Sequence, residues 1–290
     1  MENCISAKEA ANLMLISARI RRSALEMVFR ATSGHIGGSL SICELLAALY
    51  FKEMNIDPEN PRWPDRDRFV LSKGHCTPAL YSALAMRGFF PEEELSTFRR
   101  IDSHLSGHAE MKHVKGVDMS TGSLGQGFSA AVGMALAAKF DNKDYRVYAM
   151  LGDGEIQEGQ IWEAAMAAGN FGLNNLCAIV DNNNIQIDGT IEEIMSPYPI
   201  DEKFRAFGFN PIHCDGHDIV SICRALEEAK AEKSKPSVII ARTVKGKGVS
   251  YMENDNEWHG NDPNEEQYLI AAAELDAQLE AAEKEVKAHD

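Results

Sequence analysis

The stretch LGDGEIQEGQIWEA, residues 151–164, decides the fold. It follows the apolar run YRVYAM (145–150) and places Asp153 between two glycines at the end of an apparently buried strand. Two interpretations are open for this strand end. In the simpler one, glycine supplies a bend and Asp153 caps the helix that follows. In the other, the carboxylate and the backbone beside it form a site for a metal ion and a phosphate group.

The composition is that of a large, acidic, globular chain. Its 290 residues, 44% of them hydrophobic, suffice for one large domain or two small ones. The chain has 29 basic and 44 acidic residues, which gives a net charge of −15. This charge argues against nucleic acid and anionic membrane surfaces as partners. A phosphorylated ligand remains compatible, because a divalent cation and helix N-termini can bind phosphate in an acidic protein.

Neither a targeting segment nor a disulfide framework is indicated. The N-terminal residues MENCISAKEA lack the basic start and apolar run of a signal peptide, and no apolar stretch approaches the roughly 20 residues of a membrane span. Six cysteines are scattered without a CxxC pair, which is typical of reduced thiols. We therefore expect a soluble, cytoplasmic protein. Among the cysteines, Cys43, Cys177 and Cys223 fit small buried hydrophobic positions.

The order of elements predicts an α/β fold with a mainly parallel sheet flanked by helices. Apolar spacing predicts a long amphipathic helix over residues 6–31, and a closing helix is expected at about 264–288. Between them, strands rich in Val, Ile and Ala alternate with helices, so we expect a single domain over residues 1–290. Strands are predicted at 66–75, 145–154, 176–184, 209–214 and 237–246, and helices at 77–88, 122–140, 155–172 and 217–233.

Polar residues follow two of these strands. Asp153 ends one, and Asp181, Asn182, Asn183 and Asn184 end the next. If the two strands are neighbours, these side chains meet at one sheet edge, where ligands bind in folds of this class. Carboxylate, amide and backbone carbonyl oxygens suit Mg²⁺ or Ca²⁺ and not zinc. For the four residues after the second strand alone, an ordinary turn is the simpler interpretation; the pairing of both strand ends favours a metal site.

The spacing of these strand ends carries a family resemblance. Between Gly154 and Asn182 lie 27 residues (155–181), which resembles the thiamine diphosphate motif, GDG followed at about that distance by NN. Further segments, from about Ser33 to about Pro263, resemble those of transketolases in the same order, over the first portion of a full transketolase. They are SGHIGGSL with His35, SKGHCTPALY with His75, LSGHAE with His108, STGSLGQG, and EWHGNDPN with His259.

The resemblance implies a thiamine-diphosphate-binding fold and specific residue roles. Mg²⁺, which Ca²⁺ or Mn²⁺ could replace, would be bound by the side chains of Asp153 and Asn183 and the backbone carbonyl of Ile185. The implied cofactor-binding residues are His75, Gly122, Leu124, Gly154, Glu158, Asn183 and His259. Of these, Gly154, His75 and His259 would contact the diphosphate, Gly122 and Leu124 the aminopyrimidine, and Glu158 would help to link two active sites. The implied catalytic residues, which would bind sugar hydroxyls and help to move protons, are His35, His75, His108 and His259.

The resemblance also implies a partner. In transketolases a separate domain, which follows this one, holds the cofactor's pyrimidine ring, and this chain ends at Asp290. One interpretation is the N-terminal subunit of a split transketolase, active with a C-terminal transketolase subunit in an α2β2 heterotetramer. It would transfer a two-carbon ketol unit between sugar phosphates, by default xylulose 5-phosphate and ribose 5-phosphate of the pentose phosphate pathway.

Alternative functions stay open. The chain could be a non-catalytic thiamine-diphosphate-binding module, although the intact set of ligand residues favours the enzyme. Deoxyxylulose-phosphate synthase and 2-oxo-acid dehydrogenases share GDG and NN, but the histidine segments count against both. A nucleotide-binding dehydrogenase is poorly supported, because no GxGxxG follows a strand.

Some polar residues match nothing in the family. We interpret four histidines as surface or structural residues: His104, His113, His213 and His217. Lys245 and Lys247, in the segment RTVKGKG, could bind phosphate or close a loop, but a solvated loop is the favoured interpretation.

Overall fold

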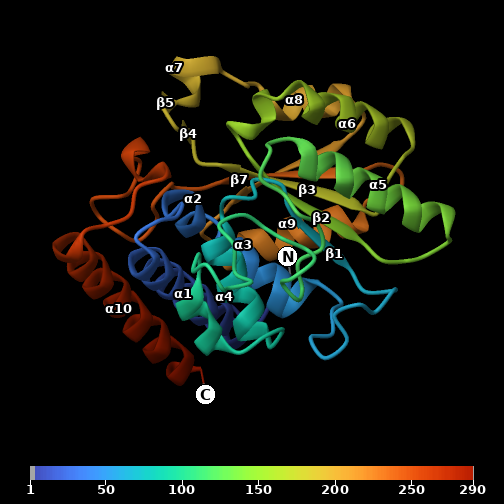
Figure 1. Cartoon of the computed structure of the whole chain (residues 1–290). Helices are drawn as coiled ribbons and strands as arrows, with labels where there is room; N and C mark the ends of the chain where they lie inside the picture. Colours follow the sequence, from blue (N-terminus) through green and yellow to red (C-terminus); the bar gives the residue numbers. More distant parts are fainter. Residues whose placement is uncertain (1–3, 290) are drawn as a thin grey trace.

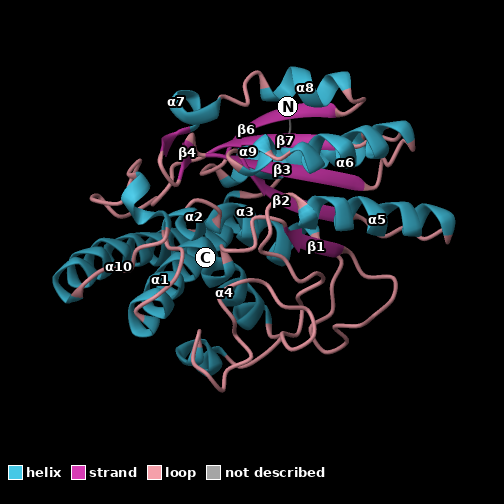
Figure 2. Cartoon of the chain, turned by 45° about the horizontal axis from the view of Figure 1, so that its top comes forward, coloured by secondary structure: helices cyan, strands magenta, loops and turns pink. Residues whose placement is uncertain are grey.

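A five-stranded parallel sheet forms the centre of the protein (Figures 1 and 2). The computed structural model describes residues 4–289, so the ends of the domain predicted over 1–290 lie outside the described residues. Every pairing in this sheet is parallel, as the alternation of strands and helices predicts. In spatial order the strands are β1 (Arg68–Leu71), β2 (Val147–Gly152), β3 (Leu176–Asn182), β7 (Ser237–Arg242) and β6 (Asn210–Asp215).

Helices cover both faces of the sheet (Figure 1). On one side lie α5 (Gln126–Phe140), α6 (Gly159–Asn170) and α8 (Ile200–Ala206). On the other lie α1 (Ala7–Ala31), α3 (Cys43–Ala48), α4 (Thr77–Arg87) and α9 (Ile219–Ala231), with α10 (Glu265–Ala288) packed along α1. No helix among residues 4–289 is long and apolar enough to cross a bilayer.

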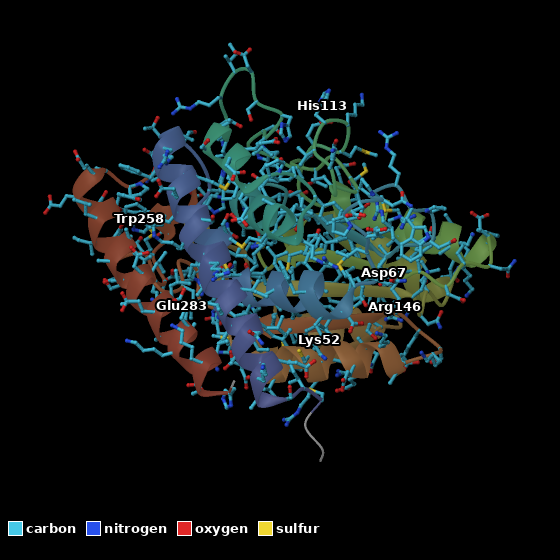
Figure 3. The ribbon with its side chains drawn as sticks, turned by 90° about the horizontal axis from the view of Figure 1, so that it is seen from below. Lys52, Asp67, His113, Arg146, Trp258 and Glu283 are labelled. Atoms are coloured by element: carbon cyan, nitrogen blue, oxygen red, sulfur yellow. The ribbon has the colours of Figure 1, made fainter. Side chains whose placement is uncertain are left out.

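The strands are apolar on both faces because both faces are buried. In β2, Tyr148 and Met150 join the core beneath α1, α3, α4 and α9, while Ala149 and Leu151 join the core beneath α5 and α6. A third, smaller core lies between α1 and α10 and includes Trp258 (Figure 3). Burial on alternate sides explains why these segments read as continuous apolar runs.

Short elements connect this framework. They are α2 (Gly37–Leu40), α7 (Ile191–Met195) and the antiparallel pair β4 (Ile185–Gln186) and β5 (Gly189–Thr190). There is also a π-helical turn at Leu49–Glu53 and 3-10 turns at Glu92–Thr97, Glu155–Gln157 and Asn256–His259. The β4–β5 hairpin and α8 were not predicted from the sequence, since each is short and lacks a clear apolar period.

One predicted helix begins later than expected. The expectation that a helix starts near Glu155 is wrong: a 3-10 turn covers Glu155–Gln157, and α6 begins at Gly159. The Glu155 side chain is buried and accepts hydrogen bonds from Ser72 Oγ (2.6 Å) and the backbone N–H of Gly152 (3.0 Å). Because these bonds turn the side chain inward, the chain makes a tight turn before the helix can start.

Candidate functional site

The two polar strand ends meet as predicted. In the register of β2 and β3, Gly152 lies opposite Asp181, so the residues that follow each strand are neighbours. Asp153 is 2% exposed, and its Oδ2 accepts hydrogen bonds from the backbone N–H of Asn184 (2.5 Å) and from Asn182 Nδ2 (3.2 Å). Burial, with the nearby Asp181 carboxylate, raises the pKa of Asp153 to about 6.

The other two predicted metal ligands lie directly beyond β3. Asn183 is buried; its Nδ2 donates to Asp181 Oδ2 (2.9 Å), and its Oδ1 accepts from the backbone N–H of Ile185 (3.1 Å). The carbonyl oxygen of Ile185 accepts a hydrogen bond from Lys245 Nζ at 3.2 Å. All these oxygens belong to two neighbouring strand ends.

All eleven predicted site residues line one cavity of about 430 Å³. They are His35, His75, His108, Gly122, Leu124, Asp153, Gly154, Glu158, Asn183, Ile185 and His259. A larger hollow of about 1160 Å³ lies over the ends of β6 and β7 and shares only Asn183 with this set. We assign the candidate site to the smaller cavity, because the chemistry-bearing residues converge there and not in the larger hollow.

Four histidines from distant segments cluster in the cavity. The ring centroid of His35 lies 5.0 Å from that of His75, 5.8 Å from that of His108 and 5.5 Å from that of His259. Burial, together with His108, lowers the pKa of His35 to about 4. Burial, together with Lys245, lowers the pKa of His259 to about 3. Neighbouring positive charge and burial therefore keep these rings neutral at pH 7.

The other two histidines follow the same pattern. Burial and the Lys73 ammonium lower the pKa of His75 well below its ordinary value, and burial and Arg99 lower that of His108. Among the described residues, His35 Nδ1 is a buried nitrogen without a hydrogen-bond partner. A buried polar atom in that condition is a candidate for a ligand contact.

Close backbone approaches shape the cavity. Gly122 has φ +154°, and a Cβ there would lie 3.1 Å from His108 Cδ2. A Cβ on Gly154 would lie 3.2 Å from Gln186 Cβ. Because glycine has no side chain, the backbone at this position stays accessible from the cavity. Glu155, which the sequence analysis did not single out, also accepts from the backbone N–H of Gly125 (2.9 Å) and so holds the loop that carries Gly122.

An ion pair beneath the cavity was also missed. Lys73 Nζ lies 2.5 Å from Asp181 Oδ2 and donates to the carbonyl of Gly38 at 3.0 Å. The Asp181 carboxylate further accepts from Ser41 Oγ (2.7 Å) and from Thr243 Oγ1. Although burial opposes the charge, Lys73 lowers the pKa of Asp181 below its ordinary value. A charged residue at the end of β1 and another at the end of β3, on either side of β2, was the available signal.

The interpretation of Lys245 as part of a solvated loop is wrong. Its side chain lines the cavity, is 2% exposed, and brings Nζ to 2.8 Å from His259 Nδ1. Burial, together with Lys73, lowers the pKa of Lys245 to about 8. The 3-10 turn that carries His259 closes over the segment and removes it from water, whereas Lys247 remains partly exposed beside Glu253.

The four histidines interpreted as surface or structural residues lie outside the cavity. His104 and His113 pair with glutamates on outer loops, and His113 is well exposed (Figure 3). His213 is exposed and lies 3.6 Å from Asp201. His217 is half-buried and has a structural role, bonding Glu44 of α3 and the backbone of Val244 just beyond β7.

The cavity fits a diphosphate and a divalent cation in its chemistry. The described residues contain no cluster of three His, Cys, Asp or Glu side chains suited to a metal ion. The oxygen set of Asp153, Asn183 and Ile185 is instead the partial set that Mg²⁺ binds when phosphate oxygens complete its coordination. Lys245 and the open backbone at Gly154 supply the positive charge and space that an anion needs.

These features define the class of protein: the fold is the thiamine-diphosphate-binding fold. Residues 13–279 match the family described as "Transketolase, thiamine diphosphate binding domain", and the chain belongs to the transketolase family. It resembles transketolase from Campylobacter jejuni with a TM-score of 0.85 and 34% identity, over 95% of this chain and 46% of that one. Mouse transketolase is 44% identical over 83% of this chain and 38% of its own length.

Shorter relatives match over almost their whole length. The 6-deoxy-6-sulfo-D-fructose transketolase subunit SqwG of Clostridium sp. (strain MSTE9) is 52% identical, over 89% of this chain and 94% of its own length. An apulose-4-phosphate transketolase subunit of Phocaeicola vulgatus is 45% identical, over 94% of this chain and 97% of its own. This chain thus spans less than half of the long transketolases but most of the relatives named as subunits.

Proposed function

We propose that this chain is the diphosphate-binding subunit of a two-chain transketolase. With thiamine diphosphate and Mg²⁺, the assembly would transfer a two-carbon ketol unit from a ketose phosphate to an aldose phosphate. The observation that carries the proposal is the convergence of four neutral histidines, Asp153 and Lys245 on one cavity at the sheet edge. The relatives named as transketolase subunits support the same conclusion.

Different residues of the chain would bind the cation, the diphosphate and the aminopyrimidine of the cofactor. Asp153, Asn183 and the carbonyl of Ile185 would hold the cation, and Gly154, His75 and His259 would hold the diphosphate. The Lys245 ammonium, which lies in the same cavity, would also hold the diphosphate. Gly122 and Leu124 would contact the aminopyrimidine. When bound, the cofactor supplies the carbon nucleophile that accepts the ketol unit.

The histidines supply the proton chemistry. Because their pKa values lie below the ordinary range, His35 and His259 are neutral at pH 7, and each neutral ring has a nitrogen lone pair that can accept a hydrogen bond from a sugar hydroxyl. His35 Nδ1, which has no partner among the described residues, is free to bind a substrate oxygen. His108 lies beside His35 at the cavity wall and would act with it on the same substrate.

A second subunit would complete the site, in a proposed α2β2 assembly in the cytoplasm. The shorter relatives are named as subunits, and one of them is named for apulose 4-phosphate. The other is named for a sulfonated sugar, so a ketose with an anionic group at its far end is the substrate class we propose. Glu158, exposed at the cavity mouth, stays a predicted contact between two active sites.

The test uses the tagged chain and the proteins that co-purify with it from the native host. Ketol transfer in the eluate that depends on added thiamine diphosphate and Mg²⁺ is the expected result. Asp153→Ala should abolish Mg²⁺-dependent cofactor binding, whereas Asp144→Ala, in the exposed loop that precedes β2, should leave it unchanged. Full activity of Asp153→Ala would contradict the metal assignment, and binding without turnover in the assembly would indicate a non-catalytic module.

A further inference from the structure

A half-buried histidine outside the cavity, His217, contacts the backbone beside Lys245. The His217 side chain is 15% exposed. Its Nε2 accepts a hydrogen bond from the backbone N–H of Val244 at 2.9 Å. Nδ1 lies 3.1 Å from Glu44 Oε2. Because Nε2 acts as the acceptor, the ring proton resides on Nδ1 and is donated to the carboxylate, which fixes both tautomer and ring orientation.

The glutamate is itself held by a buried arginine. Arg21 Nη2 lies 2.6 and 2.7 Å from the two oxygens of Glu44, and the guanidinium also donates to the carbonyl of Leu40. Both side chains are almost completely buried. Although burial opposes its charge, Arg21 and His217 lower the pKa of Glu44 to about 2, so the carboxylate stays ionised as an acceptor.

The side chain of Arg21 also lies close to Gly248, which follows Lys245 in the chain. A Cβ on Gly248, which has φ +93°, would lie 3.1 Å from Arg21 Cδ. Val244, just before Lys245, is thus hydrogen-bonded by His217, and Gly248, beyond Lys245, lies close to the Arg21 side chain. Between them, the backbone N–H of Gly246 donates to the carbonyl of Gly37 at 3.0 Å.

Two segments that line the cavity thus rest on one charged cluster. Its hydrogen bonds go to the backbone of Leu40, close to His35, and to that of Val244, next to Lys245. A buried ion pair is a weak source of net stability compared with apolar packing, but its directional bonds specify one geometry. We propose that His217, Glu44 and Arg21 form a positioning relay that fixes Lys245 for diphosphate binding; the inference rests on the proposed function.

The experiment measures thiamine diphosphate binding, not turnover. The cofactor is titrated with excess Mg²⁺ into the assembly of the full chain and its co-purified partner, by calorimetry. His217→Phe removes both hydrogen bonds of the ring and should weaken binding by about tenfold, the scale of one misplaced charged hydrogen bond. The matched control is His213→Phe, at an exposed position of β6, which should change the affinity less than about twofold.

A Lys245→Met background separates positioning from general damage. If the relay acts through Lys245, His217→Phe should weaken binding by less than about twofold once the ammonium is gone. Loss by the same factor in both backgrounds would overturn the relay, as would unchanged affinity in the parent background. Should His217→Phe fail to fold, His217→Asn replaces it, because the shorter asparagine keeps a donor for Glu44 and places no acceptor at the position of Nε2, where the N–H of Val244 is bound.

Failure of the relay is distinguishable from failure of the proposed function. If the unaltered assembly binds no thiamine diphosphate, the proposed function falls and the relay with it. If Asp153→Ala abolishes binding while His217→Phe leaves it unchanged, the proposed function stands and the relay alone is wrong.

Discussion

Replacing Asp181 by asparagine tests the structural centre of the site. The carboxylate is fully buried at the end of β3 and accepts hydrogen bonds from four side chains: Lys73, Ser41, Asn183 and Thr243. Asp181→Asn preserves the volume of the side chain, removes its charge and replaces an acceptor oxygen by a donor group. The Lys73 ammonium, on a side chain only 3% exposed, then has no counter-charge beneath the cavity.

The magnitude follows from the burial of this pair. Removing one partner of a buried ion pair lowers the free energy of unfolding by about 3–5 kcal/mol. An unfolding entropy of about 2.1 cal/mol/K per residue gives about 0.6 kcal/mol/K for a chain of this length. The expected fall in Tm is therefore about 5–8 °C.

Thermal unfolding followed by circular dichroism, without added cofactor, provides the assay. The control is Asp181→Asn combined with Lys73→Met, which removes the uncompensated charge and should recover a large part of the loss. A fall of less than about 2 °C for Asp181→Asn would refute the reasoning, because such a loss is typical of a solvated pair. A double variant no more stable than Asp181→Asn alone would refute the role of Lys73.

Two further predictions concern helix packing and pH. Gly169→Ala should lower the free energy of unfolding by at least about 2 kcal/mol in urea, because the new Cβ would lie 1.8 Å from the carbonyl oxygen of Phe207. Gly133→Ala, in α5 with nothing within 4 Å, should instead raise it by about 0.5–1 kcal/mol, and equal effects would contradict the packing argument. Because burial lowers the pKa of His35 to about 4 and that of His259 to about 3, the unfolded chain binds their protons more readily, and their contribution to stability falls as pH drops below 6.5. Imidazole resonances in nitrogen NMR should show both rings neutral at pH 5.5 without cofactor; protonated rings there would contradict the predicted pKa values.

The sequence predicts the sheet and the polar strand ends because both signals are local. Apolar runs that end in glycine and aspartate or asparagine place Asp153 and Asn183 at one edge without knowledge of any long-range contact. The strand neighbours and the parallel fold are confirmed by the register of β2 and β3. Three of the histidines, His35, His75 and His108, directly follow a glycine, and His259 precedes one, so a glycine beside each histidine was the local signal.

The missed features depend on contacts between distant segments. Lys245 reads as part of a solvated loop because neither its neighbours nor their spacing shows that the turn carrying His259 covers it. His217 is indistinguishable in sequence from an exposed histidine, since its burial depends on Glu44, 173 residues away. The late start of α6 has the same origin, because it depends on where the side chain of Glu155 finds its donors.

The β4–β5 hairpin, which forms part of the cavity rim, has a consequence for which positions around the cavity can vary. Ile187, between its two short strands, is exposed, so substitutions there should change stability by only about 0.5 kcal/mol. Replacing one partner of the buried Lys73–Asp181 ion pair should instead cost about 3–5 kcal/mol of stability. Residues at the rim can therefore change while the buried residues that set the geometry of the cavity stay as they are.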